Sequence, residues 1–422
     1  MMGHAAHRNG LGPDRGDRLF TPGFRAIVAS QVFSLLGIEI LQFVLPLHLL
    51  NLTGSGTLYG MVLAAGFIPY VGLSPVGGIL ADRTRKRGVM MTSDALLALV
   101  MAGYLALASS EALVPLTVGV LMIAFAAQAI YHPCVQSAVP LVVASARITQ
   151  ATAVANQVSM ITGIVGPVVG GLIFGFFGLV PIVAAAAASF ALSCALVALF
   201  VRIPYEPPAR TQGVVATAVS DIRDAVGFMR SRPVLWQTVA AATLVNLFGA
   251  SFINVGTPYV VTETLGLSNQ LMGVAQGALA VGGLAGGCVV ALMPGRFGIY
   301  SVPRLLAVSV AGLLVMAGAL AARPAPLTAF AAIVAGVMWI MACCTALSIA
   351  VTSHLQREAP AMLVGKVMAL AMTAANLATP AGQMVYGVMF DQVPGWVPAL
   401  LAAAAMAAVA AALARALARQ RR

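Results

Sequence analysis

Nearly all basic residues of this 422-residue chain lie in its two tails or in every second connection between a series of apolar segments. About twelve such segments, each long enough to cross a bilayer as a helix, lie between Phe24 and Ala414. Of the 23 Lys and Arg residues, 22 fall in the two tails or in the even-numbered connections; Arg323 is the exception. Because basic connections stay in the cytoplasm, the pattern predicts an even number of spans with both termini cytoplasmic.

The composition excludes a soluble globule, since 60% of the residues are hydrophobic and only 8% are charged. The net charge of +11 is spread over the cytoplasmic connections, whereas a nucleic-acid-binding protein gathers its charge on one soluble face. We expect this charge to meet anionic lipid head groups of the cell membrane. The first 25 residues lack a central apolar run, so no cleavable signal peptide is expected. None of the five cysteines belongs to a CxxC pair, so no metal site is predicted.

The longest connection between spans divides the chain into two sets of six. The expected units are a cytoplasmic tail (1–26), a six-helix bundle (27–201), a cytoplasmic linker (202–234), a second six-helix bundle (235–414) and a short tail (415–422). Apolar residues of the linker recur at helical spacing from Val215 to Met229, which predicts an amphipathic helix on the membrane surface that tethers the bundles. A regulatory role of this helix is the alternative.

The two halves resemble copies of one another. A shift of 212 residues places Gly37 on Gly249, Gln42 on Asn254, Pro46 on Pro258 and Gly54 on Gly266, and a shift of 213 places Pro167 on Pro380. Such parallel repeats suit a carrier that rocks one half against the other. The predicted fold is therefore an all-α membrane protein of twelve helices in two pseudo-symmetric six-helix bundles.

The connection after the second span reads Gly77-Gly78-Ile-Leu-Ala-Asp82-Arg83-Thr-Arg85-Lys-Arg87. It resembles the signature loop of the major facilitator superfamily, with Arg85 where the family usually has a second glycine. The resemblance implies a gating latch that joins the halves on the cytoplasmic side. Its expected members are Gly78, which permits close helix approach, and Asp82, Arg83, Lys86 and Arg87. The alternative is that the basic loop only keeps this connection on the cytoplasmic side. Asp94, one or two turns into the third span, is expected to pair with this basic loop, with a place in the transport path as the alternative.

The fifth span contains Gly166-Pro167-Val-Val-Gly170-Gly171. This run resembles the GPxxGG element of drug–proton exchangers in the same superfamily. Glycines let helices approach closely and proline permits a kink. The eighth span offers a second glycine surface, so spans five and eight are expected to meet between the halves. Ordinary packing elsewhere in the bundle is the alternative. The glycines of the eighth span are Gly282, Gly283, Gly286 and Gly287.

The segment from Gln128 to Pro133, followed by Ala138 to Val142, resembles the branch that contains macrolide exporters. The same branch includes siderophore exporters and lysophospholipid flippases. The resemblance therefore implies a proton-coupled exporter of amphipathic small molecules, working by alternating access, and leaves the cargo open among these classes. A non-transporting receptor or scaffold that keeps the fold is the alternative from another class.

Glu39 is an acid placed close to the middle of the first span. It lies 14 residues after Arg25, about 21 Å along a helix, and burial of a charged acid there costs on the order of 3 kcal/mol. We therefore expect Glu39 to couple proton movement or to bind a cationic group; a permanently protonated structural acid is the alternative. The fourth span lacks the embedded arginine that many drug–proton exchangers carry, which leaves the coupling ion open.

Other polar residues of the spans are expected to line a transport cavity. No Walker loop, HExxH motif or nucleophile elbow is present, so we expect neither an enzyme nor a bound cofactor, with the proton gradient as the energy source and the monomer as the working unit. The cavity-lining candidates are Gln31, Ser34, Gln42, Asn246, Asn254, Gln276 and Asn376.

Overall fold

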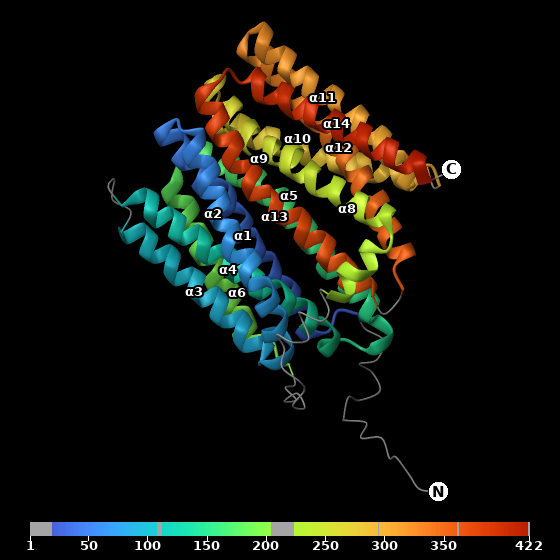
Figure 1. The fold of residues 1–422 in the computed structure, drawn as a ribbon. Coiled ribbons are helices and arrows are strands. Elements are labelled where there is room, and N and C mark those ends of the chain that lie inside the picture. The colour runs from blue at the N-terminus through green and yellow to red at the C-terminus, as the bar shows by residue number, and fades with distance from the viewer. Residues whose placement is uncertain (1–18, 108–111, 204–222, 294, 361–362, 421–422) are drawn as a thin grey trace, which may run out of the picture.

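The computed structural model describes residues 19–107, 112–203, 223–293, 295–360 and 363–420, with the backbone alone at positions 75, 79, 82 and 83. The described residues form helices and contain no strand. Figure 1 shows the helices gathered into two bundles that lie against each other along part of their length.

The N-terminal bundle consists of six long helices. Thr21 caps the first by accepting a hydrogen bond from the Phe24 amide, and Gly54 ends it in the left-handed conformation (φ 63°) that glycine adopts without strain. Ser55 caps the second helix through the Leu58 amide. The six are α1 (Pro22–Thr53), α2 (Gly56–Arg83), α3 (Lys86–Leu107), α4 (Leu113–Val142), α5 (Ile148–Phe177) and α6 (Leu179–Phe200), with the short η1 (Ser145–Arg147) before α5.

In the C-terminal bundle the seventh span is a composite. It runs through α8 (Pro233–Val245), a π-helical turn η2 (Asn246–Ala250), α9 (Ser251–Tyr259) and a second π-helical turn η3 (Val260–Thr264). The remaining helices are α10 (Asn269–Leu292), the short η4 (Ile299–Ser301), α11 (Val302–Ala322), α12 (Pro326–Glu358), α13 (Val364–Gln392) and α14 (Trp396–Gln420).

Eleven helical segments among the described residues are long and apolar enough to cross a membrane. They match eleven of the twelve expected spans. The other expected span corresponds to α13, which is 29 residues long but is not among the eleven; its sequence carries Lys366, Asn376 and Gln383. The count of twelve spans therefore stays a prediction, while the all-helical, multi-pass architecture is plain.

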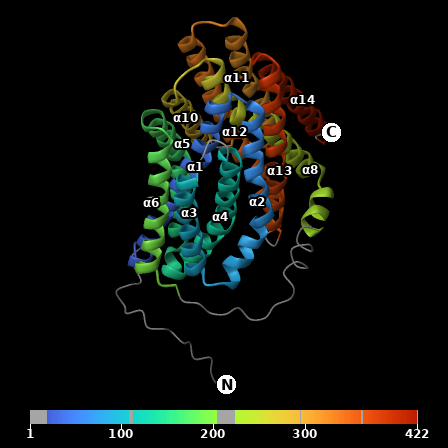
Figure 2. The same ribbon diagram turned by 90° about the vertical axis from the view of Figure 1, so that its left-hand side faces the viewer.

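The two bundles repeat one packing pattern. In the N-terminal bundle α1 packs against α5 and α6, α2 against α4, and α3 against α4 and α6. In the C-terminal bundle the seventh span packs against α13 and α14, α10 against α12, and α11 against α12 and α14. These are the contacts that a shift of six spans generates, as the duplicated sequence predicts. Figure 2 shows the two sets of helices in contact, with α13 beside α2 and α10 beside α5.

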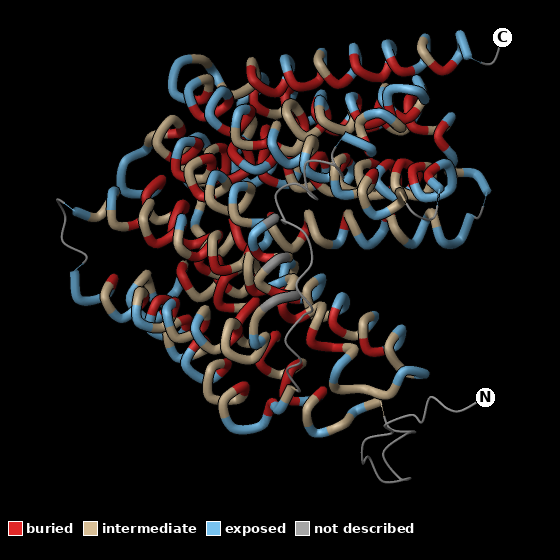
Figure 3. The backbone as a smooth tube through the Cα atoms, turned by 60° about the horizontal axis from the view of Figure 1, so that its bottom comes forward, coloured by how far each residue is buried: buried red, intermediate tan, exposed pale blue. Residues whose placement is uncertain are grey.

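The bundles meet mainly through two helix pairs, α2 with α13 and α5 with α10. A continuous apolar cluster joins the halves there, since Val44, Leu47 and Tyr59 belong to the same buried cluster as Phe252 and Val260. Hydrogen bonds between the halves occur where α1 ends and where α2 and α10 begin. The charge pattern predicts that this end faces outward. Buried segments run through both bundles (Figure 3).

The expected linker helix from Val215 to Met229 lies largely outside the described residues. Its last part is described: residues 223–230 are helical, and Ala225 and Met229 are fully buried in the cluster of the C-terminal bundle. Asp224 forms an ion pair with Lys366 of α13 at 3.1 Å. This part of the linker is therefore attached to the C-terminal bundle.

Candidate functional site

Glu39 lies in a polar cluster between α1 and α4. Gln128 of α4 donates a hydrogen bond from Nε2 to Glu39 Oε1 at 3.4 Å. Gln42, almost one turn along α1, donates from Nε2 to Gln128 Oε1 at 3.0 Å. Both helices are long apolar segments, and water is scarce at this depth in the membrane. The three polar side chains therefore form hydrogen bonds with one another. Gln128 holds the carboxylate of Glu39 at one oxygen.

Aromatic side chains of α2 and α4 adjoin this cluster. The ring of Phe125, three residues before Gln128, lies 5.3 Å from Phe67 and 6.4 Å from Tyr70, centroid to centroid. Gly66 permits this packing, because a Cβ there would come within 2.6 Å of the Phe125 ring. Tyr70 lies within electrostatic range of Glu39. An acid beside aromatic faces is the combination that attracts organic cations.

The glycine–proline element of α5 packs directly on Glu39. A Cβ at Gly166 would lie 2.5 Å from the Glu39 Cβ, so only glycine fits without displacing the acid. Gly170, one turn later, packs on Val44 and Ile40 of α1 in the same way. Pro167 lies inside α5. The element therefore fixes the part of α1 that carries Glu39.

The C-terminal bundle contains an apolar cavity of about 290 Å³. It lies between the seventh span, α12 and α13, and Asn246 is part of its wall. Asn246 begins the π-helical turn η2 and donates its side-chain amide to the Ala242 carbonyl at 3.0 Å. Ser251 donates to the Asn246 carbonyl and to the Thr379 carbonyl of α13. π-Turns recur at functional sites, and sequence analysis did not find this one.

Two of the expected cavity-lining residues are buried inside the N-terminal bundle instead. Gln31 is 1% exposed and donates to the Ala155 carbonyl and to Ser159 of α5. Ser34 is fully buried and donates to Asp94 at 2.6 Å. Gln31 therefore faces α5 and Ser34 faces α3, whereas Glu39 and Gln42 of the same helix face α4.

Asp94 also differs from expectation. Its carboxylate is fully buried and accepts hydrogen bonds from Ser34 and from Ser193 of α6, both at 2.6 Å. The basic side chains of the expected loop that the structure describes are not its partners: Arg87 donates instead to the Val197 and Ala198 carbonyls at the end of α6. Asp94 joins α1, α3 and α6.

The other cavity candidates lie at exposed or half-buried positions. Asn254 of α9 and Asn376 of α13 are exposed, and Gln276 of α10 and Gln42 are half-buried. An exposed amide on a membrane-spanning helix is expected to face water rather than lipid. These four therefore remain candidates for a water-filled path.

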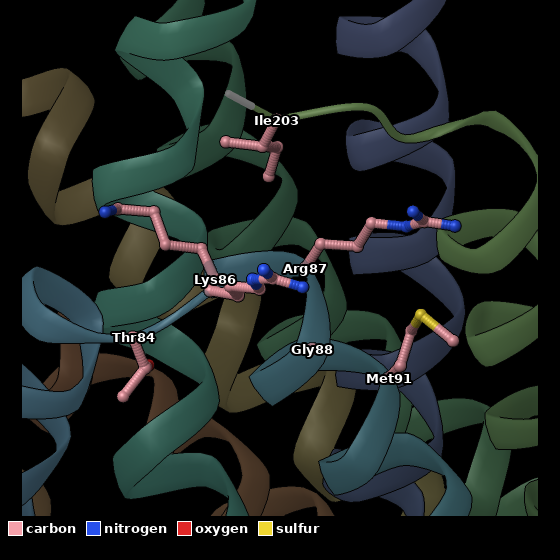
Figure 4. Close-up of a pocket in the computed structure, with 7 residues that line it drawn as sticks. Thr84, Lys86, Arg87, Gly88, Met91 and Ile203 are labelled. Atoms are coloured by element: carbon pink, nitrogen blue, oxygen red, sulfur yellow. The ribbon is translucent and has the colours of Figure 1, made fainter. Parts of the chain in front are cut away.

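The expected gating loop is described only in part. The side chains of Asp82 and Arg83 lie outside the described residues, so the latch stays a prediction. Lys86 and Arg87 point in opposite directions (Figure 4) and line a cavity of about 460 Å³ with Met91 and Ile203. Gly77, rather than the expected Gly78, permits the close approach of α2 to α4. A Cβ at Gly77 would overlap the Ala129 carbonyl of α4, whereas a Cβ at Gly78 would meet open space.

The helix-interface glycines divide between two surfaces. α5 and α10 do pack together, as expected, and Gly171 makes that contact: a Cβ there would lie 2.7 Å from the Gly273 Cα. The glycines expected on the α10 side were wrong. Gly282, Gly283 and Gly286 face α12 within their own bundle, and Gly287 faces open space.

Sequence analysis missed three contributors to these contacts. Ser193 and Asp391 each bind a distant helix, and Gly273 forms the α10 side of the interface. Gly273 and Gly277 lie four residues apart, the spacing at which small residues let helices approach closely. Among the described residues, no group of three His, Cys, Asp or Glu is placed to hold a metal ion.

Comparison with known proteins agrees with this architecture. Residues 27–383 match the family model of the Major Facilitator Superfamily. Macrolide efflux protein A of Streptococcus pyogenes is 24% identical over 383 residues, covering 88% of this chain and 90% of that protein. Macrolide efflux protein A of Enterococcus faecalis is 26% identical over 259 residues, which is 60% of this chain and 76% of that protein.

Solved structures share the fold at low identity. The crystal structure of a D-xylose–proton symporter superposes with a TM-score of 0.72 at 14% identity, covering 92% of this chain and 96% of the symporter. An inward-facing bacterial homologue of the human lysosomal transporter Spinster gives 0.64 at 14% identity, covering 97% and 95%. With the matched family model spanning most of its helices, the chain belongs to the Major Facilitator Superfamily and is a multi-pass membrane transporter.

Proposed function

We propose that this transporter exports amphipathic, macrolide-like small molecules in exchange for protons, with Glu39 as the group that alternates between proton and cationic cargo. The observation that carries the proposal is the packing of Gly166 on Glu39, whose carboxylate Gln128 holds. The element that resembles drug–proton exchangers thus contacts the acid of the first span. The two relatives named for macrolide efflux favour the same cargo class.

The surroundings of Glu39 suit a carboxylate that changes partners. A single neutral amide at 3.4 Å is a weak substitute for a counter-ion. The carboxylate therefore gains from taking up a proton, or from an amine that also stacks on the rings of Phe67 and Phe125. Competition between proton and amine for one carboxylate couples their movements in opposite directions if the carrier changes orientation only when one of them neutralises Glu39.

The apolar cavity beside Asn246 suits the uncharged part of such a cargo. Met341, Met368 and Met372 line it, and methionine adapts to ligands of different shape. A cargo with one amine and a large apolar body would use the acid of one bundle and the cavity of the other. The lysophospholipid and siderophore alternatives lack a specific observation of this kind.

The test is flux in proteoliposomes with a macrolide as the probe, comparing wild type with Glu39→Gln. We expect the variant to lose pH-gradient-driven uphill transport at least tenfold while retaining downhill equilibration. The control is Asp224→Asn, an exposed acid paired with Lys366 outside the spans, which should keep full uphill flux. Full uphill flux in Glu39→Gln with an unaltered pH profile would show that the glutamate is structural. Absence of macrolide flux in wild type, with flux of a lysophospholipid or a siderophore, would reassign the cargo.

A further inference from the structure

Asp391, at the end of α13, binds the beginning of α2 in the other bundle. Its Oδ1 accepts a hydrogen bond from the Gly56 amide at 2.7 Å. Its Oδ2 accepts from the Thr57 amide at 2.8 Å and from the Ser55 hydroxyl at 3.0 Å. The partners are more than 330 positions apart in the chain. One exposed carboxylate therefore ties the two halves together at the end expected to face outward.

The strength of this contact follows from the helix terminus. The first amides of a helix have no partner within the helix, and the aligned peptide dipoles place partial positive charge there. A carboxylate that accepts from two of these amides satisfies both and meets that charge. Hydrogen bonds to an ionised acceptor are shorter and stronger than neutral ones, in keeping with the distances to Gly56 and Thr57.

The backbones of α2 and α13 touch beside the carboxylate. A Cβ at Gly387 would overlap the Gly56 carbonyl, and a Cβ at Gly60 would overlap the Gln383 carbonyl. A second hydrogen bond between the halves, from Asn51 of α1 to Asn269 of α10 at 2.9 Å, lies at the same end. The outer ends of the bundles are thus closed in this structure.

The α2–α13 contact and the α5–α10 contact form two seams between the bundles. The α5–α10 seam lacks such a carboxylate. The 213-residue shift that places Pro167 on Pro380 also places Gly178 at the position of Asp391. Glycine contacts form that seam, Gly171 on Gly273 and Gly175 on Gln270. Of the two seams, only the α2–α13 seam therefore has a carboxylate at the helix start among the described residues.

We propose that Asp391 is the latch of the outer gate: it holds α2 to α13 while the outward end is closed and must leave the amides of Gly56 and Thr57 each time that end opens. The proposal rests on the outward orientation predicted from the charge pattern and on alternating access as the working cycle of the family. It is independent of the cargo and of the role of Glu39.

Asp391 is not a proton carrier on this account. It lies beyond the expected span 367–389. Burial raises its pKa, but hydrogen bonds from Thr57, Gly56 and Ser55 outweigh burial and hold the pKa below its usual range. A lowered pKa means that the latch is fully formed above the ordinary aspartate pKa and weakens only as the pH falls through the lowered value. Tyr259 and Glu263, the titratable neighbours of this seam, carry no positive charge. We therefore expect the strength of the latch to be the same at every external pH between about 5 and 8.

The test measures how often the outer end opens, through the rate at which an impermeant maleimide added outside cells labels Leu63→Cys. Leu63 of α2 packs against the cluster that joins the halves; the native cysteines are replaced. We expect Asp391→Asn to label about tenfold faster, the factor that corresponds to about 1.4 kcal/mol. Ser55→Ala should label faster by a smaller factor, since it removes one uncharged donor. The wild-type rate should be equal at pH 5 and pH 8.

Two controls make the result decisive. Thr53→Cys, exposed at the end of α1, must label rapidly from outside, which establishes the orientation. Glu263→Gln removes another acid at this end, 3.4 Å from the Cβ position of Gly54, and should leave the Leu63→Cys rate unchanged. An unchanged rate in Asp391→Asn, or an equal increase in Glu263→Gln, would overturn the latch. Because no cargo or gradient enters this experiment, its failure is distinct from failure of the proposed export.

Discussion

Ser193 of α6 donates a hydrogen bond to Asp94 of α3 at 2.6 Å in the fully buried interior of the N-terminal bundle. Ser34 of α1 donates to the other carboxylate oxygen. The phenol of Tyr131 lies beside the same group, close to Ser34 and Ser193. Three helices are thus joined through one acid whose two oxygens are both satisfied, which identifies Asp94 as an anchor of the bundle.

We predict that Ser193→Ala lowers the stability of the protein by about 2 kcal/mol, the usual scale for loss of a buried hydrogen bond to a charged group. The measurement is the midpoint of thermal unfolding in detergent. Ser231→Ala, which removes only an exposed bond to Phe228, should leave the midpoint unchanged. Equal midpoints for Ser193→Ala and wild type would contradict the anchor.

The two acids of the spans should differ in chemical reactivity. Glu39 is half-buried with one weak partner, whereas Asp94 is fully enclosed. We predict that an apolar carbodiimide, which reacts with protonated carboxyl groups in membranes, modifies Glu39 and spares Asp94. Peptide mass spectrometry gives the answer directly. The amide variant Glu39→Gln serves as the unreactive control, and preferential modification of Asp94 would reverse the roles assigned to the two residues.

Glycine substitutions should separate the interface between the halves from packing within one half. Gly171→Ala places a methyl group against Gly273 and should force the outer ends apart, whereas Gly282→Ala collides with the Met338 carbonyl and should destabilise the C-terminal bundle. We expect the first to lower flux with a nearly unchanged unfolding midpoint and the second to lower the midpoint by several degrees. Gly78→Ala meets open space and should change neither; a large effect there would contradict the assigned contacts.

Much of the architecture followed from the sequence because membranes impose strong rules. Apolar length and the placement of Lys and Arg predict helices and their direction. The repeat offsets also correspond to packing: Gly37 lies against Phe190 of α6, and Gly249 lies against Met406 of α14. Two residues at equivalent positions of the repeat thus each pack against the last helix of their own bundle.

The faces of individual helices could not be predicted in the same way. In a soluble helix polar residues mark the exposed side, but Gln31, Ser34 and Asp94 are buried: Ser34 donates to Asp94, and the Gln31 amide donates to the backbone of α5. Polar groups inside a membrane protein gather wherever partners exist, whether or not water is present. Helical period alone therefore cannot distinguish a cavity wall from a buried contact.

The last prediction concerns the apolar cavity between the seventh span, α12 and α13. Ala371 of α13 lines it, and Ala371→Phe should fill much of its volume of about 290 Å³. If the apolar body of the cargo binds there, the variant should raise the KM for macrolide transport at least tenfold, because the cargo loses the apolar surface that it would bury. The unfolding midpoint should stay equal or rise, since a filled cavity restores packing contacts. Leu377→Phe, on an exposed face of the same helix, is the matched control and should leave the KM unchanged. A higher midpoint with an unaltered KM would show that the cavity is a packing defect, and the cargo site would then have to be sought beside Glu39 alone.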